Sequence, residues 1–269
     1  MKYFSLLFFA LILLFSCSGP ENKKHNPAEI TGNPHAEGFD LENSDQKAID
    51  IADKVMTAMG GRASWDSARF FVWNFFDRRD LWWDKQTGNV RIESPADSTI
   101  LLVNIHTMEG KAMVKGEEIT QPDSLSKLLN KAKSIWINDA YWLFMPFKLK
   151  DTGVTLKYLR EDTTLTGTPS DVVQLTFQNV GDTPQNKYEV WVDQSDSLVK
   201  QWAFYREASQ DSASAIWPWD NYAQYGNLKL SGDRSDNKGP KRIQTPADIP
   251  TAFFKELLMR NDELQITND

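Results

Sequence analysis

The stretch FFVWNFFDRRDLWWDKQTGNVRI, residues 70–92, decides the fold class. Its aromatic and β-branched runs at 70–76 and 81–83 are typical of strands, and the turn residues Asp84–Gly88 precede a third run in which apolar and charged residues alternate. Two more strand-like runs follow, at residues 100–105 and 111–119. Five such runs joined by short turns predict an antiparallel meander.

Two segments have helical rather than strand-like periodicity. In both, apolar residues recur at three- and four-residue steps, which indicates an amphipathic helix. Gly60-Gly61 ends the first segment and Pro146 closes the second. The apolar positions are Ala48, Ile49, Ala52, Val55, Met56 and Met59 in the first segment, and Leu125, Leu128, Leu129, Ala132, Ile135, Trp136, Ala140 and Leu143 in the second.

Further strand-like runs follow the second helix, at residues 154–159, 172–177, 188–192, 198–205 and 228–230. The pattern predicts a mainly β fold with helices (α+β), in which a curved antiparallel sheet or incomplete β-barrel is covered by the two amphipathic helices. Such a cover is expected because an exposed apolar face and open edges invite aggregation. A cavity between sheet and helices and a solid core are both compatible with this pattern.

The N-terminus has the features of an anchoring signal. Lys2 precedes an apolar run of about a dozen residues, too short for a helix that must cross ~30 Å of hydrocarbon at ~1.5 Å per residue. The run therefore predicts a signal peptide. Leu14-Phe15-Ser16-Cys17 resembles the lipobox of bacterial lipoproteins, which implies cleavage after Ser16 and attachment of lipid to Cys17. An ordinary secretory signal followed by an unpaired cysteine is the alternative.

This signal predicts a signal peptide at 1–16, a lipidated flexible tether at 17–43 and a single domain at 44–269. We expect a monomeric lipoprotein of the outer membrane, with the membrane as a partner through the N-terminal lipid anchor. The periplasmic and the surface face remain alternatives. The net charge of −7, without a run of basic residues, argues against binding of nucleic acid.

The sequence contains none of the common catalytic motifs. It has no Gly-x-Ser-x-Gly elbow, no Walker-type glycine loop and no His-Glu-x-x-His. Since the only cysteine is assigned to the lipid and His106 is the only histidine after residue 43, we predict no metal, no cofactor and no enzymatic activity. Asp77, Asp80 and Asp84 flank the aromatic strands and would be the first candidates for glycoside hydrolysis, with solvated loop acids as the alternative.

Ten tryptophans supply the candidate binding residues. Large aromatic side chains fill cores, but they also line apolar grooves and sugar-binding faces. The candidates lie on adjacent predicted strands, on the second helix and in an irregular segment around Pro218. They are Trp73, Phe75, Trp82 and Trp83, then Trp136, Tyr141, Trp142 and Phe144, and finally Trp217 and Trp219.

A set of motifs resembles uncharacterised Gram-negative outer-membrane lipoproteins, a group similar to the LolA/LolB-like lipoprotein-carrier superfamily. The motifs are Gly60-Gly61, Trp65, Trp83-Asp84, Thr87-Gly88, Arg91 and NDAYWLFMPFKL at 138–149. The resemblance spans residues 45–249 and implies an incomplete antiparallel barrel whose helices enclose an apolar cavity for acyl chains. It favours a membrane-anchored lipoprotein that binds a lipid or other apolar ligand. The alternative is a carbohydrate-binding surface lipoprotein that uses exposed tryptophans such as Trp217 and Trp219.

Overall fold

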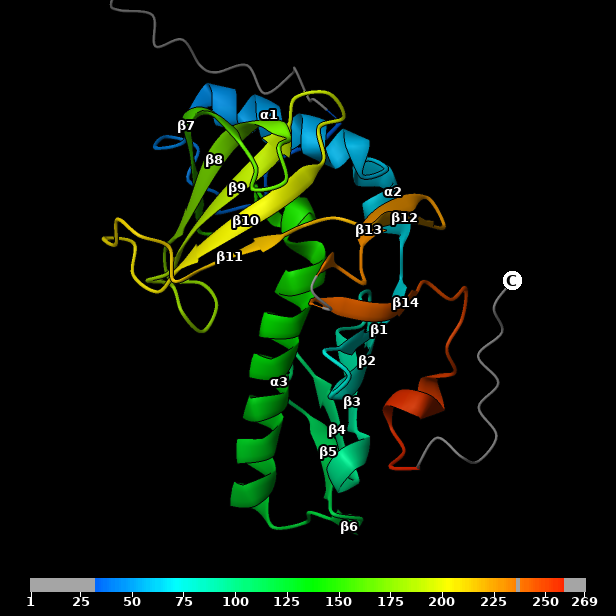
Figure 1. The fold of residues 1–269 in the computed structure, drawn as a ribbon. Coiled ribbons are helices and arrows are strands. Elements are labelled where there is room, and N and C mark those ends of the chain that lie inside the picture. The colour runs from blue at the N-terminus through cyan, green and yellow to red at the C-terminus, as the bar shows by residue number, and fades with distance from the viewer. Residues whose placement is uncertain (1–31, 236–237, 259–269) are drawn as a thin grey trace, which may run out of the picture. The chain divides into compact units, whose positions relative to one another are not determined.

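Two antiparallel sheets and a long helix organise the described part of the chain, residues 32–235 and 238–258 of the computed structural model (Figure 1). One sheet has seven described strands, in the order β14 (Pro240–Gln244), β1 (Phe70–Phe75), β2 (Arg79–Asp84), β3 (Asn89–Ser94), β4 (Thr99–Asn104), β5 (Gly110–Val114) and β6 (Glu117–Glu118). The other has five, in the order β11 (Ala215–Pro218), β10 (Val199–Tyr205), β9 (Lys187–Asp193), β8 (Pro169–Phe177) and β7 (Val154–Thr163). A separate ribbon pairs β12 (Tyr222–Tyr225) with β13 (Leu228–Ser231). The sheets do not close into a barrel, and the predicted fold class is confirmed.

Both predicted helices are present. The first, α1 (Gln46–Ala58), ends at Gly60, whose φ of +114° and close approach to the Asn227 carbonyl leave no room for a Cβ atom. The second, α3 (Pro122–Phe144), begins at Gln121, whose side-chain oxygen accepts a hydrogen bond from the Ser124 amide at 2.6 Å. The shorter helical elements are α2 (Arg62–Ser67), η1 (Pro95–Asp97), η2 (Met145–Lys148) and η4 (Thr251–Phe254).

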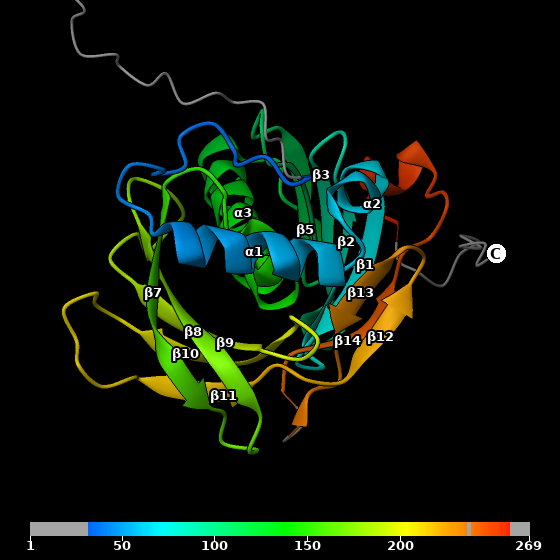
Figure 2. The same cartoon turned by 90° about the horizontal axis from the view of Figure 1, so that it is seen from above.

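Helix α3 covers one face of the seven-stranded sheet. Helix α3 packs along β4 and β5 and reaches β13 and β14. Helix α1 contacts β7 and η2, and the view from above shows it crossing from the β7 side to the β1 side (Figure 2). Between them, the two helices therefore contact strands of both sheets: α3 those of the seven-stranded sheet and α1 strand β7 of the five-stranded sheet.

The seven-stranded sheet is also covered on its other face. Successive side chains of a strand point to opposite faces, so Phe71 and Trp73 enter the main core while Phe70 and Val72 contact the C-terminal segment, residues 249–258. Arg91 fastens this segment. Its guanidinium, 1% exposed, donates to the Phe253 and Glu256 carbonyls at 2.9 and 2.8 Å and pairs with Glu93 at 2.6 Å.

The folded region begins earlier than the predicted boundary at residue 44. Phe39 is buried in the core, and the amides of Ala36 and Asp40 donate to the carbonyls of Lys150 and Val154 at 2.9 and 3.0 Å. These bonds tie residues 33–43 to the start of β7. The predicted signal peptide and Cys17 lie outside the described residues. Among those described, no helix is long and apolar enough to cross a membrane.

Candidate ligand-binding site

The C-terminal half of α3 carries one wall of the candidate site. Trp136, Ala140 and Phe144 follow one another at four-residue steps, and Ile137 and Tyr141 form the neighbouring stripe. One helix face therefore presents both stripes to the space between the sheets.

Two arginines, Arg79 and the buried Arg234, hold this half of α3 in place. Arg79 of β2 makes a bidentate ion pair with Asp139, at 2.6 and 2.7 Å, and the Asp139 side chain is fully buried. Burial raises the pKa of Asp139, and the Arg79 contact opposes that rise. Arg234, which stacks on Trp219 at 3.7 Å, donates to the Trp142 carbonyl. A cation at this end of a helix also complements the helix dipole.

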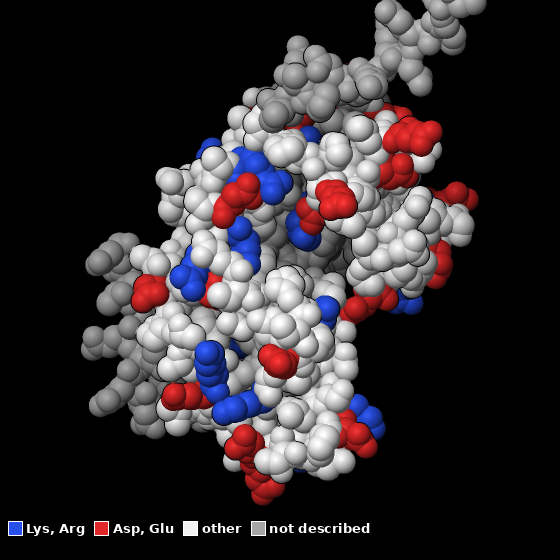
Figure 3. Space-filling model, turned by 180° about the vertical axis from the view of Figure 1, so that it is seen from behind, with Lys and Arg blue, Asp and Glu red and all other residues white. Residues whose placement is uncertain are grey.

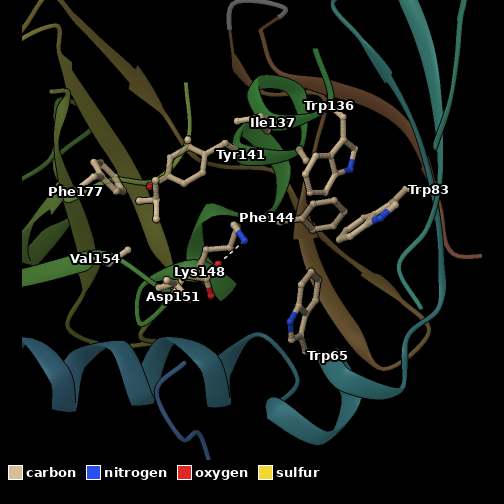
Figure 4. A pocket seen from close by; sticks show the side chains of 14 residues that line it. Trp65, Trp83, Trp136, Ile137, Tyr141, Phe144, Lys148, Asp151, Val154 and Phe177 are labelled. Carbon is tan, nitrogen blue, oxygen red and sulfur yellow. Dashed lines mark hydrogen bonds and ion pairs between the residues drawn. The ribbon is translucent and has the colours of Figure 1, made fainter. Parts of the chain in front are cut away.

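A pocket of about 320 Å³ opens beside this helix face (Figure 4). We call it the aromatic pocket. Trp65, Trp83, Trp136 and Phe144 form one side of it, and Tyr141, Val154 and Phe177 lie opposite, with Lys148 and Asp151 between the two sides. The remaining lining residues are Ile137, Ala140, Thr152, Val180 and Gly181.

The aromatic side of the pocket is held together by ring contacts. Trp65 stacks on Phe147 with centroids 4.5 Å apart and planes 13° from parallel, and Trp83 meets Trp136 edge-on at 5.3 Å. Phe144 contacts Trp83 at 5.6 Å. Such pairs contribute about 0.5–1.5 kcal/mol each beyond their area burial, so this side of the pocket is preorganised.

Three buried polar atoms on the pocket walls have no hydrogen-bond partner among the described residues. They are the indole nitrogens of Trp83 and Trp136 and the hydroxyl of Tyr141. Burial raises the pKa of Tyr141 well above its ordinary value, so the phenol is neutral and keeps its proton. The walls thus combine apolar rings with unused hydrogen-bond donors.

The charged groups of the pocket are already paired. Lys148 bonds Asp151 three residues later, and both side chains are 38% exposed. This pair adds no net charge to the pocket. A charged ligand end would therefore find no unpaired counter-ion in the described lining.

Of the ten predicted binding residues, four line the aromatic pocket: Trp83, Trp136, Tyr141 and Phe144. Trp142 lines a neighbouring pocket together with Tyr141. Trp73 and Phe75 lie in the main core, where Trp73 meets Phe144 edge-on at 5.7 Å. They support the pocket without lining it.

The prediction that Trp82 and Trp83 face a common cavity is wrong. The two are consecutive on β2, so Trp82 points to the opposite face and packs on Phe253 at 5.2 Å. The prediction that Trp217 and Trp219 are exposed is also wrong. Trp219 is fully buried, and Trp217 is partly buried against Trp142 at 4.7 Å.

Several lining residues were not predicted. Trp65 was expected near the end of the first helix but not in a site, and Phe177 and Val154 belong to predicted strands without a functional signal. Their location depends on how the five-stranded sheet faces α3. The ion pair Lys148–Asp151 had a local signal, because charges three residues apart in a helical turn are neighbours.

Of the candidate acids, Asp77 and Asp80 both pair with Arg242, at 3.6 and 3.3 Å, whereas Asp84 pairs with Arg69 at 2.9 Å. Asp77 pairs with Lys241, which lowers its pKa. Burial acts to raise the pKa of Asp84, but hydrogen bonds from Arg69 and Thr87 outweigh it, so its pKa lies below the ordinary value. Asp80 accepts from Asn74 at 2.9 Å. His106 is exposed, and the described residues contain no group of three or more His, Cys, Asp or Glu placed to hold a metal.

The fold and pocket define an open, mainly antiparallel α+β structure with an aromatic cavity, and solved structures of similar fold are known. A DUF1329 family protein from Desulfovibrio piger has a TM-score of 0.42 and 10% identity, over 77% of this chain and 97% of its own. The LolA superfamily protein NE2245 from Nitrosomonas europaea has a TM-score of 0.38 and 11% identity, over 78% and 97%. MucB, in complex with MucA(peri), has a TM-score of 0.23 and 14% identity, over 78% and 59%.

A LolA superfamily protein is thus among the solved structures to which the chain is similar. No protein-family model matches the chain, and the search of curated proteins found no match. What the pocket binds is argued from its own residues.

Proposed function

We propose that the protein is an outer-membrane lipoprotein, anchored through Cys17, that binds a lipid or another apolar ligand in the aromatic pocket without catalysing a reaction. The lipobox-like LFSC at 14–17 supports the anchor. The aromatic pocket supports the proposed binding of an apolar ligand.

The observation that carries the proposal is the composition of the pocket walls. Nearly all lining residues are aromatic or aliphatic, and the one ion pair is internally neutralised. Small-molecule sites are typically concave, about 300–1,000 Å³ in volume, and mostly apolar with few polar groups. An acyl chain gains about 0.8 kcal/mol for each methylene removed from water, which suits this lining.

The lowered pKa values of Asp77 and Asp84 count against either of them as the acid in glycoside hydrolysis. Glycoside hydrolysis needs one carboxyl with a raised pKa beside a second carboxylate, about 5–10 Å away. Asp77 and Asp84, the acids that flank the aromatic strands, instead have lowered pKa values because cations pair with them.

Displacement of a fluorescent fatty acid tests the proposal on residues 18–269. This form is suitable because residues 31–269 make one compact unit. Ile137→Trp places a large ring at a half-buried position that lines the pocket, and we expect it to lower affinity at least tenfold. Ser134→Trp, at an exposed position three residues earlier on α3, is the matched control and should bind like the unmodified protein.

Equal affinity of the two variants would contradict the assignment of the pocket. Absence of saturable uptake by the unmodified protein, together with a ligand-free mass in native mass spectrometry, would contradict apolar-ligand binding itself.

A further inference from the structure

The aromatic pocket continues into a second cavity of about 280 Å³, which we call the polar pocket. Five residues line both: Ile137, Tyr141, Phe177, Val180 and Gly181. The first two lie on α3, Phe177 ends β8, and the last two belong to the loop 178–186 that joins β8 to β9. The two cavities are therefore neighbours that share these side chains and part of the loop 178–186 in their lining.

The polar pocket differs from its neighbour in hydrogen-bonding character. Asn138, Asp182, Thr183 and Asn186 contribute to its lining. The amide nitrogen of Asn186 already donates to the Arg206 carbonyl at 2.7 Å, and that of Asn138 donates to the Asp139 carboxylate at 2.9 Å. These side chains still offer two amide oxygens, a carboxylate and a hydroxyl as acceptors, besides one N–H of each amide and the hydroxyl proton as donors. Hydrogen-bond donors on a ligand complement such a lining.

The charges exclude one broad class of polar end group. The described lining of the polar pocket contains the carboxylate of Asp182 and no lysine or arginine. Lys148, in the aromatic pocket, is already paired with Asp151. A phosphate or carboxylate would meet Asp182 without a free cation, whereas hydroxyl groups would donate to it. The face opposite to that of Figure 1 is hollowed near its centre, with basic and acidic side chains interspersed around the hollow rather than a basic patch (Figure 3).

Tyr141 lies at the boundary between the pockets. Its hydroxyl is buried, carries its proton and has no partner among the described residues. The centroid of its ring lies 6.3 Å from that of Phe177 and 5.3 Å from that of Tyr188. Residues 181–185 of the boundary loop are exposed. The hydroxyl is covered, so a ligand that spans the boundary brings an acceptor to it by displacing the side chains that cover it.

We propose that the two pockets form one site for an acyl ester with an uncharged, hydroxyl-bearing end, the chemistry of a monoacylglycerol. The acyl chain lies against the aromatic side of the first pocket, and the hydroxyl groups bind Asp182 and its neighbours in the second. The ester carbonyl accepts a hydrogen bond from Tyr141. This inference rests on the proposed function and specifies the ligand class of the same site.

Three ligands of one chain length test it: 1-monomyristoylglycerol, its ether analogue 1-O-tetradecylglycerol, and 1-myristoylglycerol 3-phosphate. The ester should bind residues 18–269 about fivefold to tenfold more tightly than the ether, as expected for one hydrogen bond to a buried donor. The phosphate should bind more weakly than the ester, and Asp182→Asn should narrow that gap.

Tyr141→Phe should bring the ester down to the affinity of the ether and leave the ether unchanged. Tyr222→Phe is the matched control, because the Tyr222 hydroxyl donates to the Val199 carbonyl at 3.0 Å and lines neither pocket. It should keep the ester preference.

The outcomes separate this inference from the proposed function. Equal binding of ester and ether to the unmodified protein, or tightest binding of the phosphate, would overturn the inference while apolar-ligand binding stands. Binding of none of the three would count against the proposed function as well.

Discussion

Replacement of Tyr141 by phenylalanine should stabilise the ligand-free protein. A buried hydroxyl without a partner costs about 1–3 kcal/mol in unfolding free energy, and Tyr141 has no partner among the described residues. Part of that gain is lost because the missing oxygen leaves a small void, so we expect a net increase of about 1 kcal/mol. For a domain of this size the melting temperature should rise by about 2–4 °C.

Denaturant unfolding of residues 18–269 measures this change, with Tyr222→Phe as the comparison. Tyr222 is equally enclosed, but its hydroxyl donates to the Val199 carbonyl at 3.0 Å. Its replacement should lower the unfolding free energy by about 1 kcal/mol. The two substitutions delete the same atom and should have opposite signs. If Tyr141→Phe destabilises the protein as much as Tyr222→Phe, the hydroxyl has a partner in the folded state and the reasoning about the pocket boundary is refuted.

Three other substitutions test ion pairs and hydrogen bonds of the fold, at Arg79 and Asp84 by denaturant unfolding and at Arg91 by amide hydrogen exchange. Arg79→Met leaves the Asp139 carboxylate buried without its partner and should cost about 3–5 kcal/mol, part of which Asp139→Asn in the same chain should restore. Arg91→Lys keeps the positive charge but loses the planar guanidinium that donates to the Phe253 and Glu256 carbonyls. The segment 249–258 is then held less firmly, so its amide hydrogens should exchange faster. Asp84 has a lowered pKa, so its ionised form stabilises the fold above its ordinary value of 3.8 and loses that contribution as pH falls through the lowered pKa. Asp84→Asn should therefore cost about 1 kcal/mol at pH 7, allowing for the solvent exposure of Arg69, and less at pH 2; an equal cost at both would contradict this.

Local periodicity predicted the elements that make one wall of the site. The three- and four-residue spacing from Leu125 to Leu143 predicts α3, and four aromatic residues of its C-terminal half line the two pockets. Trp136 and Tyr141 lie five residues apart and Tyr141 and Phe144 three, so a single helix brings them together without help from distant parts of the chain.

Pairing between distant segments could not be predicted in the same way. Strand β14 pairs with β1 although more than 150 residues separate them, and its start at Pro240 with Lys241 and Arg242 gives no apolar alternation. Trp82 shows a different failure. Because consecutive residues of a strand point to opposite faces of the sheet, Trp82 and Trp83 cannot face one cavity. The prediction grouped them because both are large aromatic residues.

A buried indole or phenol donor without a hydrogen-bond partner indicates a binding role only where it lies beside a cavity. Indoles such as those of Trp73 and Trp202 are also without a hydrogen-bond partner among the described residues, yet they lie in the closed core and indicate only that aromatic packing outweighed one donor. Tyr141 differs because two cavities meet at its ring, and among the described tyrosines it alone has a buried hydroxyl without a partner. Native proteins violate polar satisfaction chiefly where function requires it. A donor left unpaired beside an apolar cavity lowers the stability of the empty protein and becomes available to a ligand, so the stability and binding experiments on Tyr141 measure two consequences of one arrangement.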